Sequence, residues 1–226
     1  MKVRKYILAA FVTLMAVSCA EDDFVDVDPL NQINSENFFN TPQDFELALV
    51  GSYDLLHTTH QNVMIGDIAS DNTLAGGESA NDGIGFQEMD EMVHTPVNEQ
   101  LRNVWQWMYA GIQRTNYIAE FQDKIDFEGK ANILGQNAFL RAYYYFELVK
   151  FFGDVPMPIG KRVDFGNSST YPRVPKAEVY AQIEADLSFA AANLPLSQPE
   201  PGRVTKGAAL ALLGKAQLYQ EKFAEA

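Results

Sequence analysis

The sequence has a single cysteine and few basic residues. One cysteine among 226 residues excludes an internal disulfide and a zinc site built from several cysteines. The 17 Lys and Arg are outnumbered by 30 Asp and Glu, which gives a formal net charge of −13. This charge repels phosphate backbones, so nucleic acid is not expected as a partner. Apolar residues still make up 47% of the chain, which is enough for a folded core.

The N-terminal apolar stretch is too short for a membrane span. Residues 6–17 form a run of twelve, whereas crossing a bilayer takes about 20 apolar residues. A basic start, Met1–Lys5, precedes the run, and this order is typical of a secretory signal peptide. Ala16–Cys19 then resembles a bacterial lipobox, in which the cysteine becomes the lipidated N-terminus. We expect residues 1–18 to be removed and Cys19 to carry a membrane anchor, the alternative being an ordinary secreted protein.

Residues 19–40 are interpreted as a lipidated tether. The acidic run Glu21–Asp23 is either a solvated linker or a signal similar to the one that sends Bacteroidetes-type lipoproteins to the outer face of the outer membrane. Pro29 biases the preceding residue away from helix. The folded part is therefore expected to begin after residue 40 and to fill residues 41–226.

The rest of the chain predicts an all-α fold. Apolar residues recur at helical spacing over 41–56, 98–122, 130–151, 176–193 and a segment that begins near Thr205. Asn40 or Thr41 suits the N-cap of the first helix, and Thr205 suits that of the last. The helix over 130–151 is apolar on nearly every side, which indicates burial between neighbours. Two long irregular segments, 66–95 and 153–175, separate the helices, and segments of this length are often functional.

The last predicted helix carries a tetratricopeptide-like spacing. Leu213 and Gly214, followed by Phe223 and Ala226, match that repeat, with Glu221 in place of the glycine usual at the turn. Gly214 would let a paired helix approach, and Phe223 and Ala226 would begin it. Because the sequence ends there, we expect the helical domain to be truncated at its C-terminal end.

Several segments, taken in order, resemble the SusD/RagB family. The strongest match is the run FLRAYYYFELVKFFGDVP at 139–156. The other matches are FELALVGSY at 45–53, SDN at 70–72, Trp105 with Tyr109, Ile112 and Asn116, Asp186-Leu187 with Leu194-Pro195, and GRVTKGAA at 202–209. The chain is therefore identified as similar to the N-terminal part of this family.

The resemblance implies a glycan-capture lipoprotein at the cell surface. Its implied partner is a TonB-dependent outer-membrane barrel of the SusC type, and its implied fold is a set of tetratricopeptide-like helical pairs whose long loops carry the ligand site. No cofactor is implied. The resemblance also places the protein in the outer membrane, lipid-anchored and facing the exterior, and implies binding without catalysis.

Candidate glycan-binding residues come from the first long segment and the second helix. Asn72, Asn81 and Asp82 can hydrogen-bond sugar hydroxyls, and Phe86 can stack on a sugar ring. The alternatives for this segment are a plain solvated loop and a weak Ca²⁺ site. Trp107 projects from a different helix face than Trp105, so it is either an exposed platform for a sugar ring or a packing residue. Trp105 and Tyr109 are expected to pack in the core, and Arg141 to serve the scaffold.

Two other functions stay open at this point. A tetratricopeptide-type scaffold would bind only protein partners, and a surface hydrolase would need a catalytic constellation. The sequence has no Gly-x-Ser-x-Gly, P-loop or His-Glu-x-x-His motif. His57 and His60 have the spacing of two metal ligands on a helix, without an evident third ligand.

Overall fold

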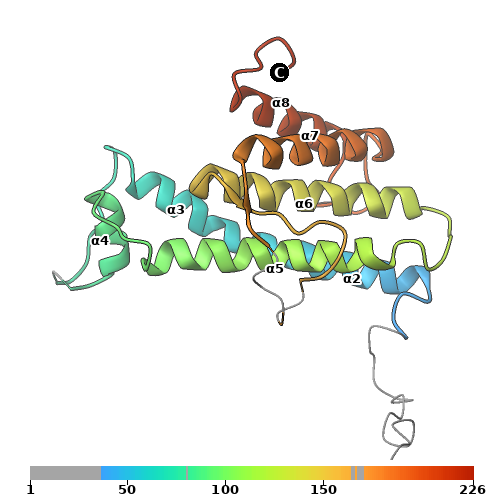
Figure 1. Cartoon of the computed structure of the whole chain (residues 1–226), viewed down its shortest axis with the longest axis horizontal. Helices are drawn as coiled ribbons and strands as arrows, with labels where there is room; N and C mark the ends of the chain where they lie inside the picture. The colour runs from blue at the N-terminus through green and yellow to red at the C-terminus, as the bar shows by residue number, and fades with distance from the viewer. Residues whose placement is uncertain (1–36, 80, 164–165, 167–170) are drawn as a thin grey trace, which may run out of the picture. The chain divides into compact units, whose positions relative to one another are not determined.

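A computed structural model describes residues 37–79, 81–163, 166 and 171–226. The predicted signal peptide, Cys19 and the acidic run lie outside the described residues. Residues Phe39–Ala226 form one compact unit. This unit is made almost wholly of helices, which confirms the predicted all-α class (Figure 1).

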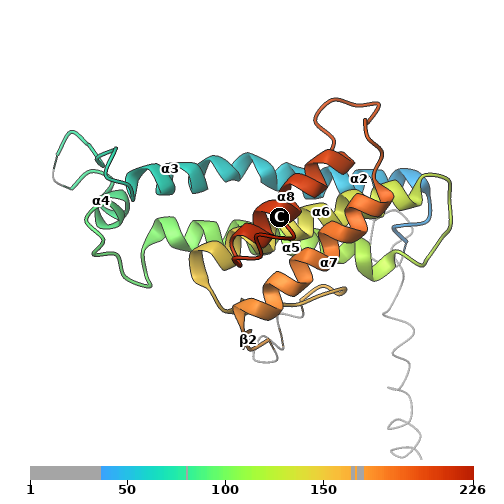
Figure 2. The ribbon, with the colours of Figure 1, turned by 90° about the horizontal axis from the view of Figure 1, so that it is seen from above.

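The helices follow in the order predicted, with additions. They are α2 (Pro42–Asp54), the 3₁₀ helix η2 (Leu55–Thr59), α3 (His60–Ile68), α4 (Ile84–Asp90), α5 (Glu99–Phe121), α6 (Lys130–Phe152), α7 (Lys176–Asn193) and α8 (Lys206–Leu218). Two short strands, β1 (Val155–Pro156) and β2 (Arg173–Val174), pair antiparallel. Helices α2, η2 and α3 succeed one another along one edge, as the view from above shows (Figure 2).

Local capping signals explain where the helices begin. Thr41 Oγ1 accepts from the Asp44 N–H at 3.3 Å, and the Asp44 carboxylate accepts from the Thr41 N–H at 2.8 Å. This reciprocal capping box satisfies two N–H groups that have no partner within the helix. Asn98 caps α5 in a similar way by accepting from the Gln100 N–H at 2.9 Å, and Thr205 caps α8.

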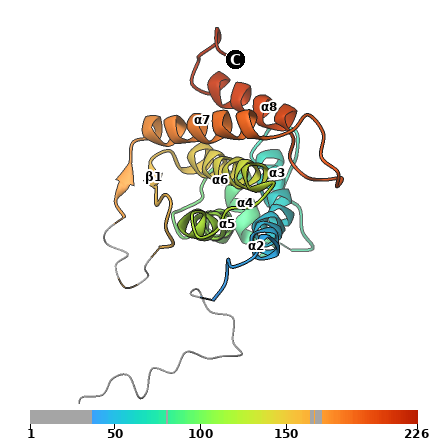
Figure 3. The same ribbon diagram turned by 90° about the vertical axis from the view of Figure 1, so that its right-hand side faces the viewer.

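Helix α6 is the centre of the unit. It lies between α5 and α7, as the end-on view makes plain (Figure 3). Its fully buried side chains include Leu140, Tyr144, Tyr145, Phe146 and Leu148. Gly111 of α5 faces the Tyr144 ring, where a Cβ atom would come within 2.5 Å of the ring carbon Cε2. The glycine therefore sets the close approach of α5 to α6.

A buried ion pair joins α6 to α7. Arg141 donates through Nε to one oxygen of Asp186 at 2.8 Å and through Nη2 to the other at 2.7 Å. The side chains are only 12% and 6% exposed. Burial by itself lowers the pKa of Arg141, but the hydrogen bonds and charge of Asp186 outweigh it, so the net shift of this pKa is upward. Arg141 thus serves the scaffold, as predicted.

One sequence prediction about local structure was wrong. Residues 66–95 are not one long irregular segment, because α3 continues to Ile68 and α4 forms within them. Residues 219–226, where the second helix of the tetratricopeptide-like pair was expected to begin, form turns and irregular backbone, and Phe223 is 72% exposed. Glu221, which stands where the repeat usually has glycine, adopts a left-handed conformation with φ of 61°.

Candidate functional site

A stripe of polar residues on α5 holds the segment 153–163 against the helix. Tyr109 Oη donates to the Pro156 carbonyl at 2.6 Å. Asn116 donates to the Pro158 carbonyl at 2.9 Å and accepts from the Gly160 N–H at 3.2 Å. Gln113 Oε1 accepts from the Val163 N–H at 2.8 Å. Residues 109, 113 and 116 share one helix face, so the segment follows the axis of α5.

An ion pair extends this stripe by one more turn. Glu120 accepts from Arg162 Nε at 2.7 Å, and the Arg162 guanidinium lies 4.4 Å from the centre of the Tyr117 ring. The hydrogen bond from Arg162 holds the pKa of the Glu120 carboxyl below its usual value. The pair is partly exposed, so its main effect is to position the segment rather than to stabilise the fold.

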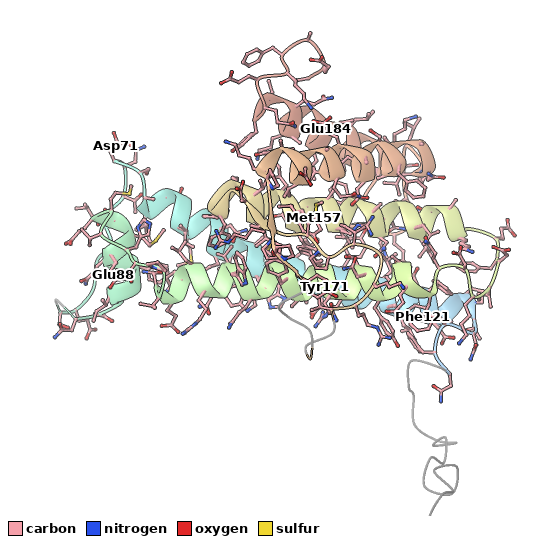
Figure 4. All side chains as sticks on the ribbon, in the orientation of Figure 1. Asp71, Glu88, Phe121, Met157, Tyr171 and Glu184 are labelled. Atoms are coloured by element: carbon pink, nitrogen blue, oxygen red, sulfur yellow. The ribbon has the colours of Figure 1, made fainter. Side chains whose placement is uncertain are left out.

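A cleft lies where the segment leaves the helix. Its volume is about 660 Å³, within the range of small-ligand sites. The lining is largely apolar and comes from α5, the segment after α6 and the residues before β2: Trp105, Gln106, Tyr109, Ala110, Ile112, Gln113, Arg114, Pro156, Pro158, Val163 and Tyr171. Figure 4 labels Tyr171, just before β2, over the middle of α5, and Met157 on the segment 153–163. The cleft therefore combines a helix face with backbone that the helix itself holds in place.

Trp105 stands between this cleft and a second hollow. The second hollow, of about 720 Å³, is lined by residues 94–97, Leu101, Arg102, Trp105, Phe151, Phe152 and Arg173. The Trp105 ring centre is 4.8 Å from that of Tyr109 and 5.1 Å from that of Phe152. Trp105 and Tyr109 are half-buried. Burial raises the pKa of the Tyr109 phenol. These two rings, expected to be core residues, thus pack together and also line the cleft.

Most of the predicted ligand residues gather at the end of the unit formed by α3 and α4. Asn72, Asn81 and Asp82 are exposed, and Phe86 is half-buried on α4. The Asp82 carboxylate accepts from the Glu78 N–H at 3.1 Å, so it also shapes its own loop. Figure 4 marks this end by Asp71 and Glu88.

Asn98 fixes α4 to the start of α5. Its Nδ2 donates to the Gly85 carbonyl at 2.9 Å and to the Glu88 carboxylate at 2.8 Å, while its Oδ1 caps α5. This link gives the short helix α4, and Phe86 on it, a defined position. The sequence pattern alone does not indicate this link, because Gly85 and Glu88 lie in the segment 66–95 that it predicts to be irregular.

Trp107 lies on α5 and is not among the residues that line either hollow. It is half-buried, and Arg114, seven residues later on the same face, donates to the Gly51 carbonyl of α2. The face that carries Trp107 and Arg114 thus borders α2, and Arg114 also lines the edge of the cleft. The structure brings Asn72, Asn81, Asp82 and Phe86 to one end and places Trp107 on the body of α5.

The two histidines turn toward helix backbone. His57 Nδ1 contacts the Asp54 carbonyl, and His60 Nδ1 lies 2.9 Å from the His57 carbonyl. In the part of the chain that the structure describes, no three His, Cys, Asp or Glu side chains are grouped to hold a metal ion. Within the same residues, no helix combines the length and the apolar character needed to cross a bilayer.

A family match over most of the chain identifies the helical fold. Residues 23–218 match the SusD-like family whose description is "Starch-binding associating with outer membrane". The chain belongs to this SusD-like family. It is 28% identical, over 99% of its length, to SusD-like protein P2 of Formosa agariphila. The predicted family is confirmed.

Solved structures share the fold. A laminarin-binding SusD-like protein is 32% identical, superposes with a TM-score of 0.76, and matches 83% of this chain. A SusD-like protein from Bacteroides fragilis is 26% identical, with a TM-score of 0.75 over 88% of this chain. The chain spans less than half of each relative: 45% of protein P2, 42% of the laminarin-binding protein and 39% of the B. fragilis protein.

Proposed function

We propose that this chain captures an oligosaccharide or polysaccharide at the outer membrane and delivers it to a TonB-dependent barrel of the SusC type. The observation that carries the proposal is the family match over residues 23–218, because the family is described as starch-binding and associated with the outer membrane. A relative that is 32% identical is named for binding laminarin, so β-glucans of that kind are the first ligands to test.

The proposed activity is binding without turnover. The sequence carries no motif for a serine hydrolase, a P-loop enzyme or a zinc protease. The 30 acidic residues make chance carboxylate pairs common, so such pairs do not support a glycosidase. The alternative function is a scaffold of the tetratricopeptide type that binds only proteins.

The proposed ligand residues at the α3–α4 end are Asn72, Asn81, Asp82 and Phe86. Their support is exposure: three of them present amide or carboxylate groups to solvent, and Phe86 keeps part of its ring accessible. Trp107 is proposed as a fifth contact, on the strength of its partly accessible indole. Neutral sugars are bound mainly by stacking and hydroxyl hydrogen bonds, so salt should have little effect.

The proposed anchor is a lipid on Cys19, with residues 1–18 as signal peptide and 19–40 as tether. Cys19→Ala should release the protein from the membrane fraction, because no acylated residue would remain. Cys19→Ser is a matched variant of nearly the same size that also cannot form a thioether. Retention of both variants in the outer membrane of cells that lack the partner barrel would refute the anchor.

Affinity electrophoresis tests the proposed function directly. The chain is run through native gels that contain soluble polysaccharides, and the recovered polysaccharide is then sized by chromatography. Retardation by at least one glycan with unchanged glycan length supports capture without cleavage. Shortened products would instead support a hydrolase. The absence of retardation by any glycan, together with co-purification of a barrel partner, would favour the protein-binding scaffold.

A further inference from the structure

We infer that the cleft on α5 is a glycan subsite in which Trp105 and Tyr171 form the stacking surfaces. The inference rests on the proposed function and places a glycan subsite at residues other than the ligand residues predicted from the sequence. Both rings are half-buried and line the cleft, Trp105 from α5 and Tyr171 from the residue pair before β2. Flat aromatic faces are the usual apolar partner of the C–H faces of sugar rings, much as they are of nucleobases.

The cleft is held in shape before any ligand arrives. One wall is α5, and the other is the segment whose backbone is bound by Tyr109 and Asn116. Tyr145 of α6 donates to the same Pro158 carbonyl as Asn116, at 2.7 Å, so that wall is tied to two helices. A site whose walls are already ordered loses less conformational entropy on binding.

Two glutamine amides that line the cleft have hydrogen-bonding capacity left for a ligand. Gln106 is exposed, and for its amide no hydrogen bond occurs among the described residues. Gln113 uses its Oε1 to hold Val163, which leaves its Nε2 without a partner in the same set of residues. The two amides lie seven residues apart on one face of α5. They can therefore hydrogen-bond hydroxyls of a ring that rests on the aromatic surface.

The position of Trp105 favours a chain ligand over a single small molecule. The indole borders the second hollow as well as the cleft, and Arg173 stands at the edge of that hollow. The Arg173 guanidinium takes part in none of the ion pairs within the described part of the chain. A ligand with repeating rings can occupy both hollows across Trp105, with Arg173 as a further donor to hydroxyl or carboxylate oxygens. An oligosaccharide has this repeating geometry.

The two tryptophans give a direct test, because the sequence has only two and both lie on α5. In Trp107→Phe the sole indole is Trp105 in the cleft, and in Trp105→Phe it is Trp107 on the face toward α2. Each variant of the full chain is titrated with a glycan that retards the wild type, laminarin first. Tryptophan emission and acrylamide quenching are recorded, and calorimetry of the same samples measures binding.

The inference requires that Trp105 responds. On addition of glycan, emission of the Trp107→Phe variant should shift and become protected from acrylamide, and a response of the Trp105→Phe variant as well would support the proposed contact of Trp107. A response from Trp107 alone, or heat of binding without a response from either indole, would overturn the cleft assignment while leaving glycan capture intact. Failure of every glycan to bind the wild type would instead refute the proposed function.

A second variant separates stacking from a general change in structure. Tyr171→Ala should weaken glycan binding about tenfold, as the loss of one stacking ring does. Phe223→Ala is the matched control, because Phe223 is 72% exposed and lies outside both hollows. Equal affinities of Tyr171→Ala and wild type would overturn the inference even if both tryptophans respond.

Discussion

Replacement of Asn116 by alanine tests how the segment 153–163 is held. Asn116 is fully buried, donates to the Pro158 carbonyl and accepts from the Gly160 N–H. Alanine removes both bonds. The Pro158 carbonyl keeps the Tyr145 hydroxyl, but the Gly160 N–H loses its partner. Two lost bonds at about 1 kcal/mol each and one poorly satisfied N–H at about 1–2 kcal/mol predict a loss of roughly 3–4 kcal/mol.

Urea denaturation followed by circular dichroism measures this loss. For a unit of this size, a loss of about 3–4 kcal/mol corresponds to a fall in Tm of roughly 6–16 °C. The matched control is Asn72→Ala, which changes an exposed asparagine and should alter stability by less than about 0.5 kcal/mol. Equal unfolding midpoints for Asn116→Ala and wild type would show that Asn116 does not hold the segment. A less stable Asn116→Ala variant with wild-type glycan affinity would show that the segment does not shape the ligand site.

Three further perturbations have defined outcomes. Asp186→Asn leaves the buried Arg141 guanidinium without a charged partner and should lower the free energy of unfolding, measured by urea denaturation, by about 3–5 kcal/mol. The control Asp126→Asn, in the exposed pair with Lys130, should leave the unfolding midpoint unchanged. Equal midpoints for the two variants would refute the role of the buried pair. Glu221→Gly relieves the strain of a left-handed backbone conformation, so it should raise the free energy of unfolding, measured by calorimetry, by about 0.5–1 kcal/mol. A lower Tm would contradict the conformation of that turn. Burial raises the pKa of Tyr109, Tyr144 and Tyr145 above 10.0, so the stability that their neutral forms contribute is fully present below pH 10.0 and should be lost as the pH rises beyond it. Tyrosine ionisation, followed by absorbance, should therefore coincide with unfolding. Ionisation in a chain that stays folded would contradict the burial of these tyrosines.

The sequence predicted the long helices well because their signals are local. Thr41, Asn98 and Thr205 cap helices in the structure, and the predicted span 176–193 coincides with α7. Helix α4 was missed because seven residues give too few turns for a periodic pattern, and because its position depends on a link to Asn98 thirteen residues after Gly85. Short helices of this kind are stabilised by tertiary contacts rather than by propensity.

The cleft was missed for a related reason. The spacing of Trp105 and Tyr109 correctly put them on one face of a helix, but a periodic pattern does not tell what covers that face. The cover is segment 153–163, whose contact with Tyr109 joins residues 47 positions apart. At the C-terminal end, Leu213, Gly214, Phe223 and Ala226 match the repeat spacing, and Phe223 is 72% exposed in the structure.

Calorimetric titration of the full chain at low and high salt tests the central claim most directly. The ligands are soluble oligo- and polysaccharides, with laminarin among them. Capture by stacking and hydroxyl hydrogen bonds predicts a saturable heat for at least one neutral glycan, with nearly the same affinity at both salt concentrations. No heat from any glycan at millimolar concentration, or a heat that disappears when salt is raised, would contradict the account.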